Sequence, residues 1–113
     1  MSLPDIFNKA TEKNVQETLS SGKSVLIVTT LASPAYKDLC KILHAPNVSD
    51  SLEKFQCFYI PFGADICETY SLFKPAALFV LENRERPSSQ LVNNGRGVLF
   101  ASDVIKFLED NIA

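Results

Sequence analysis

The segment that most constrains the fold is the run from Ser24 to Thr30, where apolar and β-branched residues follow one another without polar alternation. Such a run predicts a strand buried on both faces, as in the centre of an α/β sheet. Ser33 and Pro34 follow it. Serine at a helix cap accepts hydrogen bonds from free backbone amides, and proline at the first helical position loses no hydrogen bond. The sequence therefore predicts a central strand and then a helix, with Leu39, Ile42 and Leu43 buried.

The other apolar patterns predict helices and strands on both sides of this unit. Residues 5–21 have apolar positions three to five apart, which favours an amphipathic helix with Asp5 as its cap. The further predicted elements are a short turn at 47–52, a strand at 55–61, a helix at 65–73, strands at 77–81 and 90–93, and a helix capped by Ser102. This order, α-β-α-β-α-β-β-α, predicts an α/β fold with a mixed four-stranded sheet flanked by helices.

Composition limits the class of protein. The 113 residues are 46% apolar and 21% charged, which suits one small domain, 1–113, and we expect it to belong to a longer protein. A net charge of −2 gives no overall positive potential that would attract the phosphate backbone, so we expect no nucleic-acid partner. Neither a membrane span nor the pattern of a signal peptide is visible. We therefore expect a soluble, cytoplasmic segment.

The cysteines do not form a recognisable site. Cys40, Cys57 and Cys67 are odd in number, and their separations of 17 and 10 residues match neither a CxxC motif nor a zinc site. Each lies in an apolar pattern, where free cysteine behaves as a small hydrophobe. We expect buried thiols, no metal, no cofactor and a reducing compartment.

Two segments resemble the thioredoxin-like family. Residues 22–28 are similar to the strand that opens many such domains, and residues 74–79 are similar to the start of their third strand. The resemblance implies a thioredoxin-like fold and a cis peptide bond before Pro75. It also implies that Ser33 and Tyr36 replace the redox pair, which needs a thiolate at a helix N-terminus. Neither residue can exchange with a disulfide, so we expect no enzyme activity.

A closer likeness is to the UAS-type domains of UBX-domain proteins. Residues 43–52 and 53–60 resemble segments of that subgroup, and residues 6–19 most resemble the N-terminal domain of UBX adaptors associated with degradation at the endoplasmic reticulum. In such adaptors the UBX domain docks on a hexameric AAA ATPase that extracts ubiquitinated substrates. The resemblance implies a non-catalytic protein-interaction module at the cytosolic face of the endoplasmic reticulum. Any ATPase contact would use a UBX region outside these residues.

One alternative stays open. Substrate-binding domains of protein disulfide isomerase relatives also lack the cysteine pair, and residues 66–72 and 75–78 are similar to them as well. The first interpretation predicts a cytosolic parent protein with reduced thiols. The alternative predicts a secretory parent with neighbouring catalytic domains.

Two surfaces are candidates for partner binding. One is the loop after the central strand, with Leu31, Ala32, Ser33 and Pro34. The other is a rim where three arginines could hold an acidic partner segment, namely Arg84, Arg86 and Arg96. We expect most of the aromatic residues between 55 and 79 to be core, because alternation along a strand sends them to both sheet faces. Some related UAS domains are thought to sense long-chain fatty acids, so an exposed aromatic patch would add a fatty acid to the candidate ligands.

Overall fold

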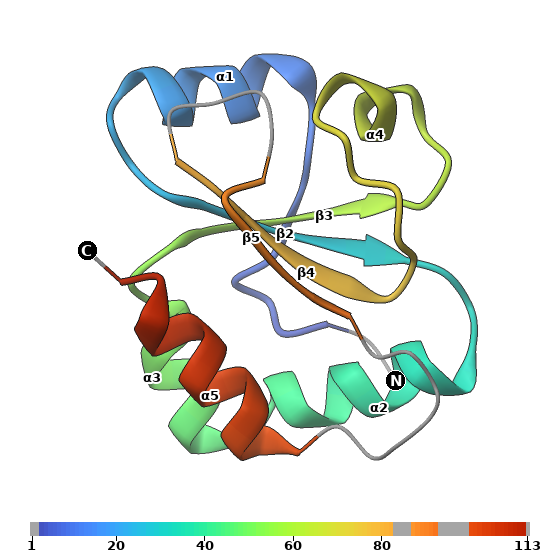
Figure 1. Cartoon of the computed structure of the whole chain (residues 1–113), viewed down its shortest axis with the longest axis vertical. Coiled ribbons are helices and arrows are strands. Elements are labelled where there is room, and N and C mark those ends of the chain that lie inside the picture. Colours follow the sequence, from blue (N-terminus) through green and yellow to red (C-terminus); the bar gives the residue numbers. More distant parts are fainter. Residues whose placement is uncertain (1–2, 83–86, 93–99, 113) are drawn as a thin grey trace.

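The computed structural model describes residues 3–82, 87–92 and 100–112, and it shows a sheet between two layers of helices (Figure 1). The strands are β1 (Asn8–Lys9), β2 (Val25–Thr30), β3 (Gln56–Pro61), β4 (Ala77–Leu81) and β5 (Ser89–Val92). The helices are α1 (Glu12–Ser20), α2 (Pro34–Leu43), α3 (Pro46–Leu52), α4 (Asp65–Thr69) and α5 (Ala101–Asp110). Helices α1 and α4 cover one face, and α2, α3 and α5 cover the other. None of these described helices is both long and apolar enough to cross a membrane.

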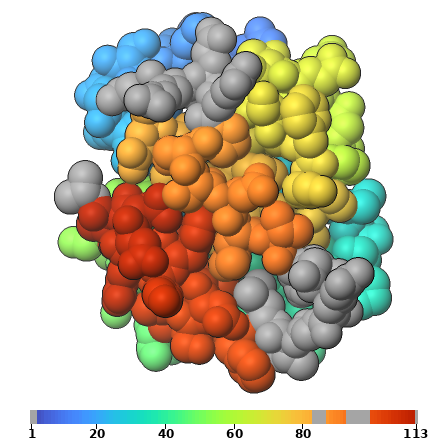
Figure 2. All heavy atoms as spheres, in the orientation of Figure 1, coloured from blue at the N-terminus to red at the C-terminus, as the bar shows by residue number. Residues whose placement is uncertain are grey.

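The sheet has five strands in the order β1-β3-β2-β4-β5. The sheet is mixed, as predicted: β2 and β3 are parallel, and β4 and β5 are antiparallel. Strand β4 also runs antiparallel to β2. The predicted α/β class is confirmed, whereas the four-stranded count is wrong by one strand. The additional strand is β1, which pairs with β3 in parallel at Phe58 and Tyr59. In the space-filling view, β5 lies on the surface between the two helical layers (Figure 2).

Strand β1 replaces the first part of a predicted helix. Thr11 caps helix α1: its hydroxyl accepts from the Asn14 backbone amide at 3.1 Å, while the Asn14 side-chain oxygen accepts from the Thr11 backbone amide at 2.8 Å. This reciprocal cap starts the helix six residues after Asp5, so Asp5 is not its cap. Upstream, the Ala10 amide donates to the Tyr59 carbonyl oxygen at 2.8 Å. The backbone of residues 8–10 is therefore hydrogen-bonded to the edge of β3 and not within a longer helix.

The core consists of two buried clusters, one on each face of the sheet. In β2, Leu26 and Val28 pack toward α2, α3 and α5, while Val25 and Ile27 pack on the opposite face. All four side chains are fully buried, which explains the absence of polar alternation in this segment. The predicted double-sided burial of the central strand is confirmed.

Two further helix boundaries differ from prediction. Helix α4 ends at Thr69 rather than at residue 73. The backbone turns at Ser71, where φ is 60°, and this conformation ends the helix. Helix α5 begins at Ala101, and the Asp103 carboxylate accepts from the Phe100 amide at 2.9 Å. Ser102 therefore lies inside the helix and is not its cap.

The predicted cis bond before Pro75 is wrong, because no peptide bond in the described residues is cis. The chain turns into β4 through Ala76 instead, where φ is 50°. The Ala76 amide donates to the Thr29 carbonyl oxygen at 3.0 Å. This hydrogen bond fixes the turn against β2 with a trans proline.

Candidate functional site

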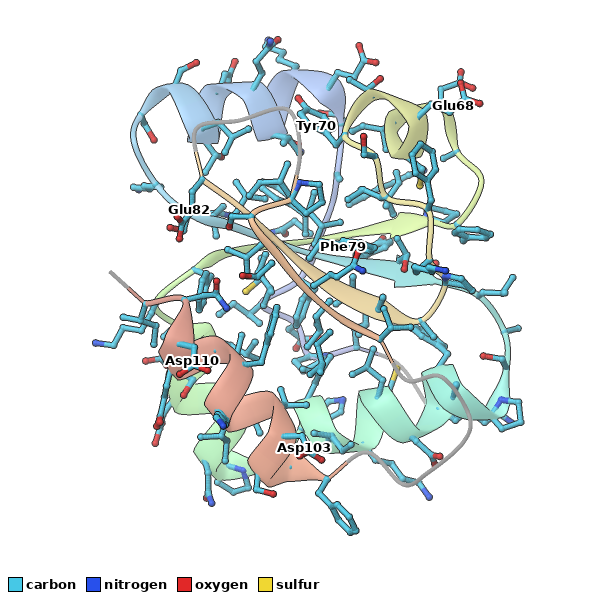
Figure 3. The ribbon with its side chains drawn as sticks, viewed as in Figure 1. Glu68, Tyr70, Phe79, Glu82, Asp103 and Asp110 are labelled. Atoms are coloured by element: carbon cyan, nitrogen blue, oxygen red, sulfur yellow. The ribbon has the colours of Figure 1, made fainter. Side chains whose placement is uncertain are left out.

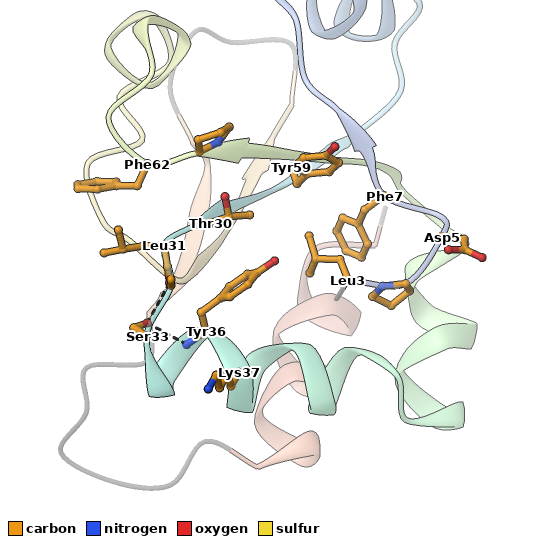
Figure 4. Close-up of a pocket in the computed structure, with 13 residues that line it drawn as sticks. Leu3, Asp5, Phe7, Thr30, Leu31, Ser33, Tyr36, Lys37, Tyr59 and Phe62 are labelled. Atoms are coloured by element: carbon orange, nitrogen blue, oxygen red, sulfur yellow. Dashed lines mark hydrogen bonds between the residues drawn. The ribbon is translucent and has the colours of Figure 1, made fainter. Parts of the chain in front are cut away.

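A groove of about 810 Å³ lies where β2 and β3 end and α2 begins (Figure 4). Its walls come from three segments far apart in sequence: residues 3–7, residues 30–37 and residues 59–62. Because β2 and β3 are parallel, their carboxyl ends lie at the same edge of the sheet. The N-terminal segment closes the third side, since β1 is hydrogen-bonded to β3. The volume falls within the range of about 300–1,000 Å³ that is usual for ligand pockets.

The wall formed by residues 30–37 contains Ser33 and Tyr36, the two residues expected to stand in place of a redox pair. The Ser33 hydroxyl accepts a hydrogen bond from the Tyr36 amide at 3.2 Å, which confirms Ser33 as the cap of α2. The same hydroxyl donates to the Leu31 carbonyl oxygen at 3.1 Å. Its proton thus points to a backbone carbonyl rather than to a base, which a serine nucleophile would require.

Tyr36 supplies a ring and a protonated hydroxyl to the groove. Burial raises the pKa of the Tyr36 phenol to about 12, and a hydrogen bond with the Cys40 thiol and the nearby Tyr59 add to the rise. The phenol therefore stays neutral at physiological pH and remains a hydrogen-bond donor. Tyr59 lines the groove from β3, so two tyrosines face this site from different elements.

The thiols lie in the interior rather than at this site. Cys40, Cys57 and Cys67 are free and buried, as predicted. Burial raises the pKa of the Cys57 thiol to about 12, and its sulfur lies 3.5 Å from the Leu52 carbonyl oxygen. A thiol exchanges with a disulfide only as the thiolate, so Cys57 is inert near neutral pH.

The structure brings some of the predicted partner-binding residues together. Leu31, Ala32 and Ser33 line the groove, whereas Pro34 is exposed in the first turn of α2 and does not line it. Leu31 is 45% exposed, so an apolar side chain is available at the rim. The three candidate arginines, Arg84, Arg86 and Arg96, lie outside the described residues.

Most of the aromatic residues are core, as predicted, but three are not. Phe55, Phe58, Tyr70 and Phe79 are buried (Figure 3 labels the last two), whereas Tyr59 is half-buried, Phe62 is 38% exposed and Phe73 is 61% exposed. Phe62 lines the groove and Phe73 does not.

The sequence did not point to the part of the groove formed by Leu3, Pro4, Asp5 and Phe7. These residues precede or begin the predicted helix, and Phe7 fits its apolar stripe. A Pro-Asp pair before a short extended stretch is a weak signal, and pairing with β3 becomes visible only in three dimensions.

Comparison with known proteins supports the fold. No protein-family model matches the sequence. No curated protein matches it either. Among solved structures, the chain is similar to Trxlp from Edwardsiella tarda EIB202, with a TM-score of 0.63 over 90% of this chain and 97% of that chain. The two sequences are 14% identical.

The chain has a thioredoxin-like fold. Its central thioredoxin-like unit is β2, the helix α2 that follows it, and β3. Within this thioredoxin-like fold, the start of α2 holds a capping serine and a neutral phenol beside an apolar groove.

Proposed function

We propose that this thioredoxin-like domain is a non-catalytic module that binds a protein segment in the groove at the start of α2. The observation that carries the proposal is the lining of the groove, which is mainly apolar and reaches the surface at Leu31 and Phe62. Partly exposed apolar side chains around a concave site are typical of a protein- or ligand-binding surface.

The chemistry at this end of α2 supports binding rather than catalysis. A redox catalyst needs a thiolate where the helix dipole lowers the thiol pKa. Here Ser33 occupies that place, and both hydrogen bonds of its hydroxyl are made with the backbone. Tyr36, one turn later, is a phenol that carries its proton near neutral pH, and burial raises its pKa further, to about 12.

A disulfide-reduction assay tests the absence of activity. The domain is incubated with dithiothreitol and insulin, and precipitation of the reduced insulin chain is followed. We expect the rate of the buffer alone. A double variant, Ser33→Cys with Tyr36→Cys, is the matched control, because it restores thiols at the start of α2 and should accelerate precipitation. Turnover by the unchanged domain would contradict the proposal.

We further propose that the parent protein is a UBX-type adaptor for the AAA ATPase that extracts ubiquitinated substrates in degradation at the endoplasmic reticulum. The support is the likeness of residues 6–19 and 43–60 to UAS-type domains. In this arrangement the groove binds a protein partner, while a UBX region elsewhere in the parent binds the ATPase. Three buried cysteines suit the reducing cytoplasm, where the cytosolic face of the endoplasmic reticulum lies.

Two observations on the native protein test this assignment. We expect a UBX region downstream of these residues. We also expect the purified hexameric ATPase to bind the whole parent but not this domain. A secretory parent is the contrary result. Asn47 is exposed and begins an Asn-Val-Ser sequence, so a glycan on Asn47 would instead favour the relative of protein disulfide isomerase.

A further inference from the structure

The groove is lined by aromatic rings from all three of its walls. Phe7 comes from the N-terminal segment, Tyr36 from α2, and Tyr59 and Phe62 from β3 and the residue after it. In Figure 4 the Phe62 ring lies beside Leu31 at one end of the groove, and Tyr36, Tyr59 and Phe7 lie between that end and Asp5. Phe7 is buried in the core, so the rings open to another chain are those of Tyr36, Tyr59 and Phe62. Such partly exposed rings offer flat apolar surfaces on which the rings of another chain can pack.

The polar groups among these rings are chiefly hydrogen-bond donors. Figure 4 shows the Tyr36 hydroxyl directed into the space between the walls, and Tyr59 brings a second hydroxyl from β3. Ser33 is committed to its cap. The one carboxylate among the lining residues is that of Asp5, which lies at the end of the groove with Leu3.

The neighbouring sheet edge is occupied by this chain itself. Strand β1 pairs with β3 at Phe58 and Tyr59, and the Ala10 amide continues the pairing to the Tyr59 carbonyl oxygen at 2.8 Å. A partner strand therefore cannot extend the sheet at this point. An occupant of the groove must be recognised through side chains instead.

We propose that the groove binds a proline-rich segment in the polyproline II conformation, with a basic residue placed beside Asp5. This inference rests on the proposed protein-binding function and names its ligand. A polyproline II segment presents carbonyl acceptors, its prolines have no N–H, and it packs its rings on aromatic-lined grooves. The hydroxyls of Tyr36 and Tyr59 can donate hydrogen bonds to those carbonyls, and Asp5 complements a cation.

Fluorescence anisotropy with synthetic peptides tests the ligand. The probe is a labelled decapeptide with one arginine followed by prolines and leucines, and the control peptide has glycine and serine in place of every proline. We expect the control to bind at least about tenfold more weakly, which is about 1.4 kcal/mol. Replacing the arginine by glutamate should weaken binding by up to about fivefold, the range of one exposed ion pair. Equal binding of the proline and glycine-serine peptides would overturn the inference.

Two phenylalanine substitutions locate the binding site. Phe62→Ser, inside the groove, should weaken binding of the probe at least about tenfold. Phe73→Ser is the matched control, since Phe73 is also exposed but does not line the groove, and it should bind as the unchanged domain does. Thermal unfolding of both variants checks that each is folded. Equal weakening by both substitutions, or by neither, would place the peptide elsewhere and contradict the inference.

A random peptide library separates this inference from the proposed function. Selection is carried out on the unchanged domain and on Phe62→Ser in parallel. Enriched peptides that contain prolines, and that are lost with Phe62→Ser, are the expected result. Proline-free peptides lost with the same substitution would overturn the ligand class but support protein binding in the groove. Absence of any groove-dependent peptide would contradict both.

Discussion

The Thr29 hydroxyl donates a hydrogen bond to the Lys74 carbonyl oxygen at 2.6 Å, although the two residues are 45 positions apart in sequence. The same hydroxyl accepts from the Ala77 amide at 3.2 Å. One fully buried side chain thus ties the end of β2 to the beginning of β4. Because that end of β2 leads into the groove, Thr29 helps to fix the position of the groove.

Replacing Thr29 tests this connection. Thr29→Val keeps the shape of the side chain but leaves the Lys74 carbonyl oxygen and the Ala77 amide without the hydroxyl. We expect the free energy of unfolding to fall by about 1–3 kcal/mol, the cost of unsatisfied buried polar groups. Urea denaturation measures the change. Thr29→Ser keeps the hydroxyl and should lose less, so a Thr29→Ser domain as unstable as Thr29→Val would contradict the role of the hydroxyl.

The cap of α2 can be tested at Ser33. Ser33→Ala removes the acceptor of the Tyr36 amide, and we expect a loss of about 0.5–2 kcal/mol in the free energy of unfolding. Ser33→Asp keeps an acceptor and places a negative charge at the positive end of the helix, so it should retain most of the stability. Thermal or urea unfolding at neutral pH distinguishes the variants. An alanine variant with an unchanged midpoint would show that the cap contributes nothing.

Ala76 and Ala77 form a matched pair for the turn before β4. Ala76 has a φ of 50°, while Ala77 lies in the strand, and both are buried. A glycine at either position loses one methyl group and gains similar freedom in the unfolded chain. Only Ala76→Gly also relieves a left-handed backbone, which costs about 1–2 kcal/mol for a residue with a Cβ atom. In urea denaturation we therefore expect Ala76→Gly to be more stable than Ala77→Gly by about that amount, and the reverse order would contradict the geometry.

Stability should fall at alkaline pH because of Cys57. Burial raises the pKa of its thiol from 9.0 to about 12, so between these values the unfolded chain loses the proton while the folded chain keeps it. The folded state then binds more protons, and the free energy of unfolding decreases as pH rises. The contribution of this thiol is fully present below pH 9 and declines by up to about 1.4 kcal/mol per pH unit above it.

Urea denaturation between pH 8 and pH 11 measures this slope, and Cys57→Ala is the control. The alanine variant starts from a lower stability because it leaves space in the core, but it should lose less with each pH unit. Tyr36, whose pKa is also raised to about 12, leaves a residual slope in that variant. Identical slopes with and without the thiol would show that Cys57 ionises equally in both states.

Local sequence signals predicted the elements whose cause is local. The apolar side chains of β2 require burial on both faces, which a central strand of a sheet provides. Ser33 and Pro34 favour a helix start through local backbone interactions alone. Strand β4 was predicted at residues 77–81, the bounds that it has. The absence of cysteine at the start of α2 likewise determines from the sequence alone that no thiol lies there.

Long-range contacts decided the rest. Strand β1 has two residues, too few for a period, and it exists because the edge of β3 offers hydrogen-bonding partners to the backbone near Asn8. The groove needs that strand, since Phe7 and Tyr59 face the same space only when β1 lies beside β3. The turn at Pro75 is likewise in contact with another strand, since the Thr29 hydroxyl donates to the Lys74 carbonyl oxygen. Sequence patterns report which residues prefer to be buried, whereas pairing across the sheet determines which of them meet.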